Sequence, residues 1–223
     1  MMYNLPILNK KLVVVILFPL LILIGATTTH AANEGDAGYR EGGWLTFGSE
    51  HGGIYSGSGV YEIKGYWGDG VVHSTFDSFK DSQYFYGWYT NPNITASKRG
   101  QIISTVAAMS ADPDITYTAQ AQLMYDDSGS SGYVNVSEIT DIRCDGVIEY
   151  AYEWNDLYVW GHSDNGKSSG TPTDFDISSK ANVKYHANLG YDEPWIEVSP
   201  RVQRGNAPVS NPTKWTQLRP RTS

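Results

Sequence analysis

The chain has 223 residues, a formal net charge of −8 at pH 7 and a single cysteine. This length suits one domain with a substantial hydrophobic core. The negative charge argues against nucleic acid or an anionic membrane surface as a partner, and one cysteine excludes an internal disulfide.

The first 31 residues have the pattern of a secretory signal peptide. Lys10-Lys11 precedes the apolar run Leu12–Ile24, and Thr29-His30-Ala31 supplies small residues for cleavage. An apolar run of this length is too short to span a bilayer comfortably, so an uncleaved anchor is the less favoured alternative. We predict that residues 1–31 are removed, that no membrane span remains and that the protein is secreted or held in the cell envelope.

The first part of the mature chain predicts short strands. Its many tyrosines and glycines, 16 and 23 in the whole chain, suit twisted antiparallel sheet and tight turns. A Gly/Ser turn, Ser56-Gly57-Ser58-Gly59, predicts a hairpin between two of the strands. The predicted strands are Trp44–Phe47, His51–Tyr55, Val60–Tyr66 and Val71–Phe76.

Helical periodicity appears later in the chain. Apolar residues recur at helical spacing in Lys98–Met109 and in Cys144–Trp154, and Leu157–Trp160 predicts one more strand. The last third is rich in Gly, Ser, Asn and Pro, which predicts irregular structure. We therefore expect one α+β domain over residues 32–203 and an irregular, proline-containing tail over residues 204–223.

Cys144 opens the second predicted helix. Backbone N–H groups at a helix N-terminus lack intrahelical partners, and the helix dipole adds positive charge there. Both effects favour a thiolate, and the same N–H groups can hold an oxyanion during acyl transfer. This placement favours a nucleophile over a buried structural cysteine, the other interpretation of a free thiol.

A nucleophilic thiol also needs a general base and a residue that orients the base. His51 lies in the strand before the hairpin turn and Glu62 in the strand after it. A loop of two or four residues places Glu62 diagonally opposite His51 on the same face of the sheet. A loop of odd length places the two side chains on opposite faces.

Two segments together resemble a known superfamily. Cys144–Tyr152, with its Gly, two apolar residues and Ala-Tyr after the cysteine, is similar to the nucleophile motif of NlpC-type cell-wall peptidases. His51–Gly57 resembles their histidine strand. Because the histidine strand comes first, the order resembles the circularly permuted branch of papain-like amidases, which includes YiiX-like proteins and relatives of lecithin–retinol acyltransferase. Asp145 departs from this pattern, since many relatives have serine there.

The resemblance implies a papain-like fold, in which an antiparallel sheet packs against a helix that carries the nucleophilic cysteine. It implies that Cys144 attacks a carbonyl, His51 transfers the proton and Glu62 orients the imidazole, with His73 as the alternative third residue. The implied substrate is an amide bond in cell-wall peptides. We further expect a monomer without cofactor, metal or nucleic-acid partner.

Three other functions fit the same residues. A catalytically silent module could keep the fold to bind cell-wall glycan or peptide. An acyl-ester hydrolase or acyltransferase would use the same catalytic group, and a secreted effector would act against another cell. Fold resemblance supports the hydrolase chemistry better than it supports any one substrate.

Overall fold

The computed structural model describes residues 31–43, 50–65, 68–159, 176–189, 199–205 and 219–220. The predicted strand Trp44–Phe47 and residues 1–30 of the predicted signal peptide lie outside these ranges. No helix within the described ranges combines the length and the apolar character that a membrane crossing requires.

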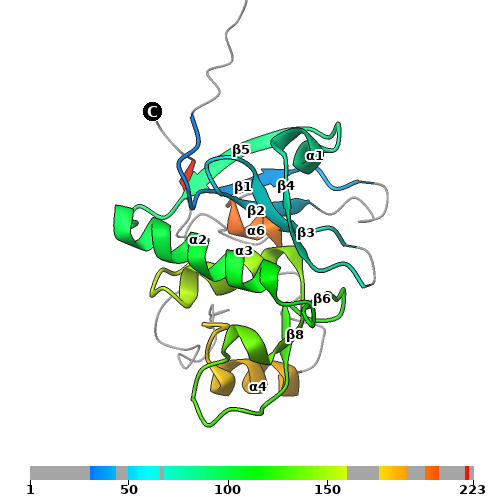
Figure 1. Cartoon of the computed structure of the whole chain (residues 1–223), viewed down its shortest axis with the longest axis vertical. Coiled ribbons are helices and arrows are strands. Elements are labelled where there is room, and N and C mark those ends of the chain that lie inside the picture. The colour runs from blue at the N-terminus through cyan, green and yellow to red at the C-terminus, as the bar shows by residue number, and fades with distance from the viewer. Residues whose placement is uncertain are drawn as a thin grey trace, which may run out of the picture.

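A six-stranded antiparallel sheet forms the upper part of the molecule in the view of Figure 1. Its strand order is β4-β3-β2-β1-β5-β9. The strands are β1 (Ala37–Arg40), β2 (His51–Tyr55), β3 (Val60–Ile63), β4 (Val71–Ser74), β5 (Phe85–Thr90) and β9 (Arg219–Pro220). The predicted α+β class and its antiparallel sheet are therefore confirmed.

A smaller sheet and several helices complete the fold. The second sheet has the order β6-β8-β7, with β6 parallel and β7 antiparallel to β8. Its strands are β6 (Thr116–Tyr117), β7 (Leu123–Tyr125) and β8 (Ile139–Ile142), preceded by the 3-10 helix η2 (Val136–Glu138). The α-helices are α1 (Phe76–Lys80), α2 (Ala96–Ala111), α3 (Cys144–Glu153), α4 (Lys180–Leu189) and α6 (Pro200–Gln203).

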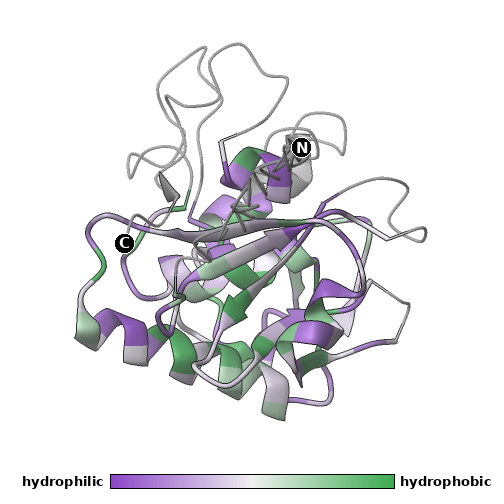
Figure 2. Cartoon of the chain, turned by 90° about the horizontal axis from the view of Figure 1, so that it is seen from above, coloured by the Kyte–Doolittle hydropathy of each residue, from purple (hydrophilic) through white to green (hydrophobic). Residues whose placement is uncertain are grey.

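Helices lie on both faces of the large sheet. On β2, a Cβ added to Gly52 would meet Ile148 of α3, whereas a Cβ added to Gly53 would meet Phe79 of α1. Because successive strand residues point to opposite faces, α3 covers one face and α1 the other. Apolar side chains of the large sheet, α2 and α3 form the core. Helix α2 carries both hydrophilic and hydrophobic residues (Figure 2).

The structure differs from the sequence expectations at several element ends. The predicted strand Val71–Phe76 stops at Ser74, because Thr75 caps α1 by accepting a hydrogen bond from the backbone N–H of Ser78. Residues 157–159 form no strand. At the C-terminus, Arg219–Pro220 pairs with β5, so the tail is not wholly irregular.

Gly146 of α3 packs closely against the backbone of a preceding loop, and this contact gives a first prediction. A Cβ added to Gly146 would lie 2.2 Å from the backbone oxygen of Gln122 and 2.8 Å from Ile142. Backbone cannot move aside cheaply, so Gly146→Ala should lower the free energy of unfolding by about 1–3 kcal/mol. Gly100→Ala in α2, where a Cβ meets nothing within 4 Å, should raise it by about 0.5–1 kcal/mol. Urea denaturation measures both, and an unchanged midpoint for Gly146→Ala would contradict this packing.

Candidate active site

Cys144 is the first residue of α3 and follows β8 after a single residue, Arg143. The Arg143 side chain does not cap the helix; it donates to both carboxylate oxygens of Asp145, at 2.7 and 2.6 Å. Tyr117 of β6 lies near Cys144, and burial together with the thiolate charge raises the pKa of this tyrosine to about 12. Because α3 begins at Cys144, the predicted start of this helix is confirmed.

The Cys144 thiol is buried, with only 8 % of the residue exposed. Burial raises the pKa of Cys144 to about 12, and the negative charge of Asp145 acts in the same direction. The charge of Arg143 and the backbone N–H groups of Gly52 and Asp145 lower the pKa, but by less. The N–H groups at the helix start act in the expected direction, but desolvation outweighs them, so the pKa of the resting thiol lies above its usual value.

His51 and Glu62 form a buried pair. Pairing of Tyr55 with Val60 closes a four-residue loop, the even length that places His51 and Glu62 on the same face. The His51 Nε2 atom lies 2.8 Å from Glu62 Oε2, and the two residues are 2 % and 0 % exposed. The structure therefore brings together two of the three predicted site residues.

The pair carries one negative charge at neutral pH. Burial lowers the pKa of His51, although the hydrogen bond to Glu62 opposes this effect. Burial alone would raise the pKa of Glu62, but the hydrogen bond from His51 and nearby groups bring it below its usual value. A neutral imidazole beside a carboxylate donates through Nε2–H, which leaves the Nδ1 lone pair to take a proton.

Cys144 contacts the backbone of β2 beside His51. The His51 ring lies on the α1 face, with its centroid 5.7 Å from that of Phe79. The Cys144 sulfur lies against the N–H of Gly52, the next residue along the strand. Within the described ranges, no hydrogen bond joins the thiol to the imidazole. The structure therefore places the Cys144 thiol beside the peptide unit that follows His51.

His73, the alternative third residue, is elsewhere. Its Nε2 atom lies 2.6 Å from the Ser56 hydroxyl, and its ring packs against Tyr61 with centroids 4.6 Å apart. His73 is exposed, whereas Glu62 is buried against His51. The geometry accordingly favours Glu62 as the residue that orients the imidazole.

Arg40 is a charged neighbour of the site that the sequence analysis missed. It pairs with His51 across β1 and β2, is 7 % exposed and lies over the Phe79 ring at 5.8 Å. Burial lowers the pKa of Arg40, whereas the negative charges of Glu62, Asp81 and Cys144 raise it. No sequence signal marked Arg40, because its strand lacks the β-branched residues that are typical of strands.

Comparison of the chain with protein-family models, curated proteins and solved structures found no match. Within the described ranges, no group of three or more His, Cys, Asp or Glu side chains is arranged to hold a metal ion.

Proposed function

We propose that this protein is a secreted papain-like thiol hydrolase that cleaves an amide bond, with the stem peptides of the cell wall as its substrate class. The carrying observation is the buried hydrogen bond between His51 and Glu62, one residue along β2 from Gly52, whose N–H contacts the thiol of Cys144 at the first residue of α3. A carboxylate, an imidazole and a thiol in this order are the parts of a triad.

The proposed reaction forms and breaks one covalent intermediate. The Cys144 sulfur attacks the substrate carbonyl while its proton moves to Nδ1 of His51, and backbone N–H groups at the start of α3 hold the oxyanion. The tetrahedral intermediate expels the amine, which takes the proton from His51, and a thioester remains on Cys144. Water then attacks the thioester, gives its proton to His51 and releases the carboxylic acid as the thiol is restored.

The protonation states define how the thiol is activated. Because the pKa of Cys144 is raised to about 12 and that of His51 is lowered, both groups are neutral at pH 7. His51 then acts as a general base during the attack, in place of a preformed thiolate–imidazolium pair. Substrate binding must turn the thiol from the Gly52 N–H toward His51 Nδ1.

Replacing Glu62 tests its assigned role. Glu62→Gln should lower kcat/KM about a hundredfold, because an amide has no negative charge to stabilise the imidazolium and can donate as well as accept, so it holds the Nε2–H tautomer less firmly. His73→Ala should change it by less than about twofold. Turnover of a synthetic stem peptide measures both, and a larger loss for His73→Ala would replace Glu62 by His73 as the third residue.

The pH profile of the same variant gives an independent readout. Glu62 raises the pKa of His51 through its hydrogen bond and its charge. Removing that charge should lower the pKa of His51 further, so His51 stays neutral to a lower pH. The acid limb of kcat/KM should therefore move to lower pH in Glu62→Gln, and a shift to higher pH would contradict the assignment.

A catalytically silent binding module is the second candidate. The observation that favours it is the burial of the Cys144 thiol and its raised pKa, which together make an unreactive sulfur. Release of a free amine from stem peptides by the wild type, and its absence in Cys144→Ala, separates the two functions. Release of an alcohol from acyl esters, with amides left intact, would indicate the ester-directed variant of the same chemistry.

A further inference from the structure

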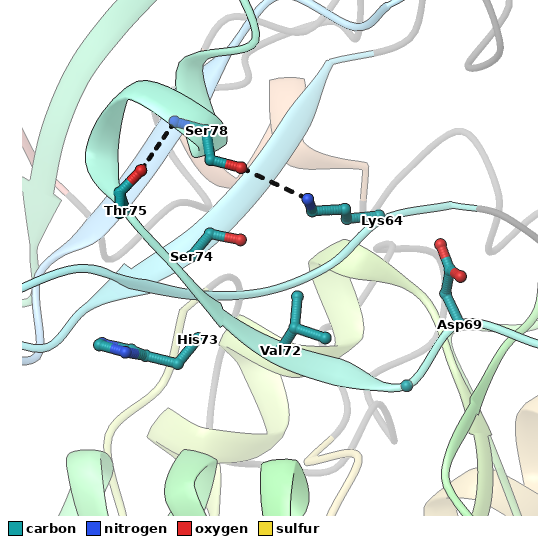
Figure 3. A pocket seen from close by; sticks show the side chains of 8 residues that line it. Lys64, Asp69, Val72, His73, Ser74, Thr75 and Ser78 are labelled. Carbon is teal, nitrogen blue, oxygen red and sulfur yellow. Dashed lines mark hydrogen bonds between the residues drawn. The ribbon is translucent and has the colours of Figure 1, made fainter.

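An open recess lies along the edge strand β4 (Figure 3). Its volume is about 410 Å³, within the range of about 300–1,000 Å³ that is common for small-molecule sites. The recess is lined by Lys64, Asp69, Gly70, Val72, His73, Ser74, Thr75 and Ser78.

Two of the lining residues connect the recess to Glu62. Lys64 follows Glu62 by two positions, and residues two apart along an extended chain share a face of the sheet. Ser74, at the end of β4, lies beside the Glu62 carboxylate, and both Ser74 and Lys64 contribute to lowering the pKa of Glu62. The recess therefore adjoins the proposed catalytic pair.

The Lys64 ammonium is the cation of this recess. It makes one long hydrogen bond of 3.4 Å, to the Ser78 hydroxyl, and no ion pair within the described ranges (Figure 3). Thr75 and Ser78, which also carry hydroxyls, line the same space. An ammonium and a hydroxyl can together donate hydrogen bonds to a carboxylate.

We infer that the recess is a substrate subsite in which Lys64 binds a single carboxylate group of the substrate. The inference depends on the proposed function only for the identity of the ligand as a substrate. Asp69 lines the same recess and repels a group with two negative charges more strongly than a group with one. A monocarboxylate therefore fits better than phosphate. Lys64 is accordingly a specificity-determining residue of the proposed hydrolase.

Binding to the Cys144→Ser variant tests the inference without turnover. The probe is synthetic L-alanyl-γ-D-glutamyl-L-lysine, compared by calorimetry with two analogues that are amidated at one carboxylate each. Amidation of one of the two carboxylates should weaken binding about tenfold, the effect of losing one charge-assisted hydrogen bond at an open site. Inorganic phosphate should not compete with the peptide.

Matched variants locate the effect. Adding Lys64→Met should remove the difference between the acid and its amide, whereas Lys64→Arg should keep it. Lys98→Met, which removes a lysine of α2 that pairs with Asp156, should leave it unchanged. Equal affinities for all three peptides, no binding of any of them, or a preference that survives Lys64→Met would overturn the inference. Selective binding by a protein that hydrolyses nothing would support the subsite and remove the proposed function.

Discussion

The variants Cys144→Ala and His51→Gln should each have a kcat/KM for a stem peptide that is lower by at least about a thousandfold. The first change removes the atom that forms the thioester, and the second removes the base that takes its proton. The double variant should be hardly worse than either single variant, because a nucleophile without its base is already nearly inert. Steady-state kinetics on one peptide measures all three.

The choice of glutamine follows from the burial of His51. His51 is 2 % exposed and is bonded to Glu62, which is 0 % exposed. Alanine would leave a buried carboxylate without its partner, which costs several kcal/mol. Glutamine keeps an N–H donor. A His51→Gln variant with wild-type melting behaviour and undiminished turnover would remove His51 from the mechanism.

Alkylation of Cys144 by iodoacetamide should be about a thousandfold slower in the native protein than in the urea-unfolded protein at neutral pH. The thiolate is the reactive form, and a pKa of about 12 in place of the usual value of about 8.5 lowers its population by about three orders of magnitude. Quenched mass spectrometry at several pH values gives the rates. The native rate should keep rising with pH beyond pH 9.

The opposite outcome would identify a different resting state. Native alkylation that is faster than in the unfolded protein, and that levels off below pH 8, would show a preformed thiolate–imidazolium pair. The neutral pair described above would then be wrong, although the assignment of Cys144 and His51 would remain. The same experiment after addition of a stem peptide shows whether binding activates the thiol.

The parts of the site that local sequence signals determine were predictable. The Gly/Ser turn set the pairing of Tyr55 with Val60, and that pairing brought Glu62 to His51. Apolar spacing after Cys144 gave the start of α3, since a helix boundary depends on its neighbours in sequence.

Features that depend on distant contacts were not predictable. β1 is buried along its whole length between β2 and β5, yet its sequence, Ala-Gly-Tyr-Arg, has no strand periodicity. The raised pKa of Cys144 follows mainly from burial, which is a property of the packed molecule. The contact between α6 and the start of α3 is another feature of this kind. Gln203 donates to the backbone oxygen of Asp145 at 2.9 Å, although the two residues are 58 positions apart in the sequence.

A crystal structure with a stem-peptide aldehyde tests the central claim most directly. An aldehyde adds reversibly to a nucleophilic thiol and resembles the tetrahedral intermediate, so a thiol hydrolase binds it covalently. We expect the aldehyde carbon to be bonded to the Cys144 sulfur, and that sulfur to lie within about 4 Å of His51 Nδ1. An aldehyde that binds without a covalent bond, with the thiol still against the Gly52 N–H, would contradict the proposed hydrolase and establish the silent module.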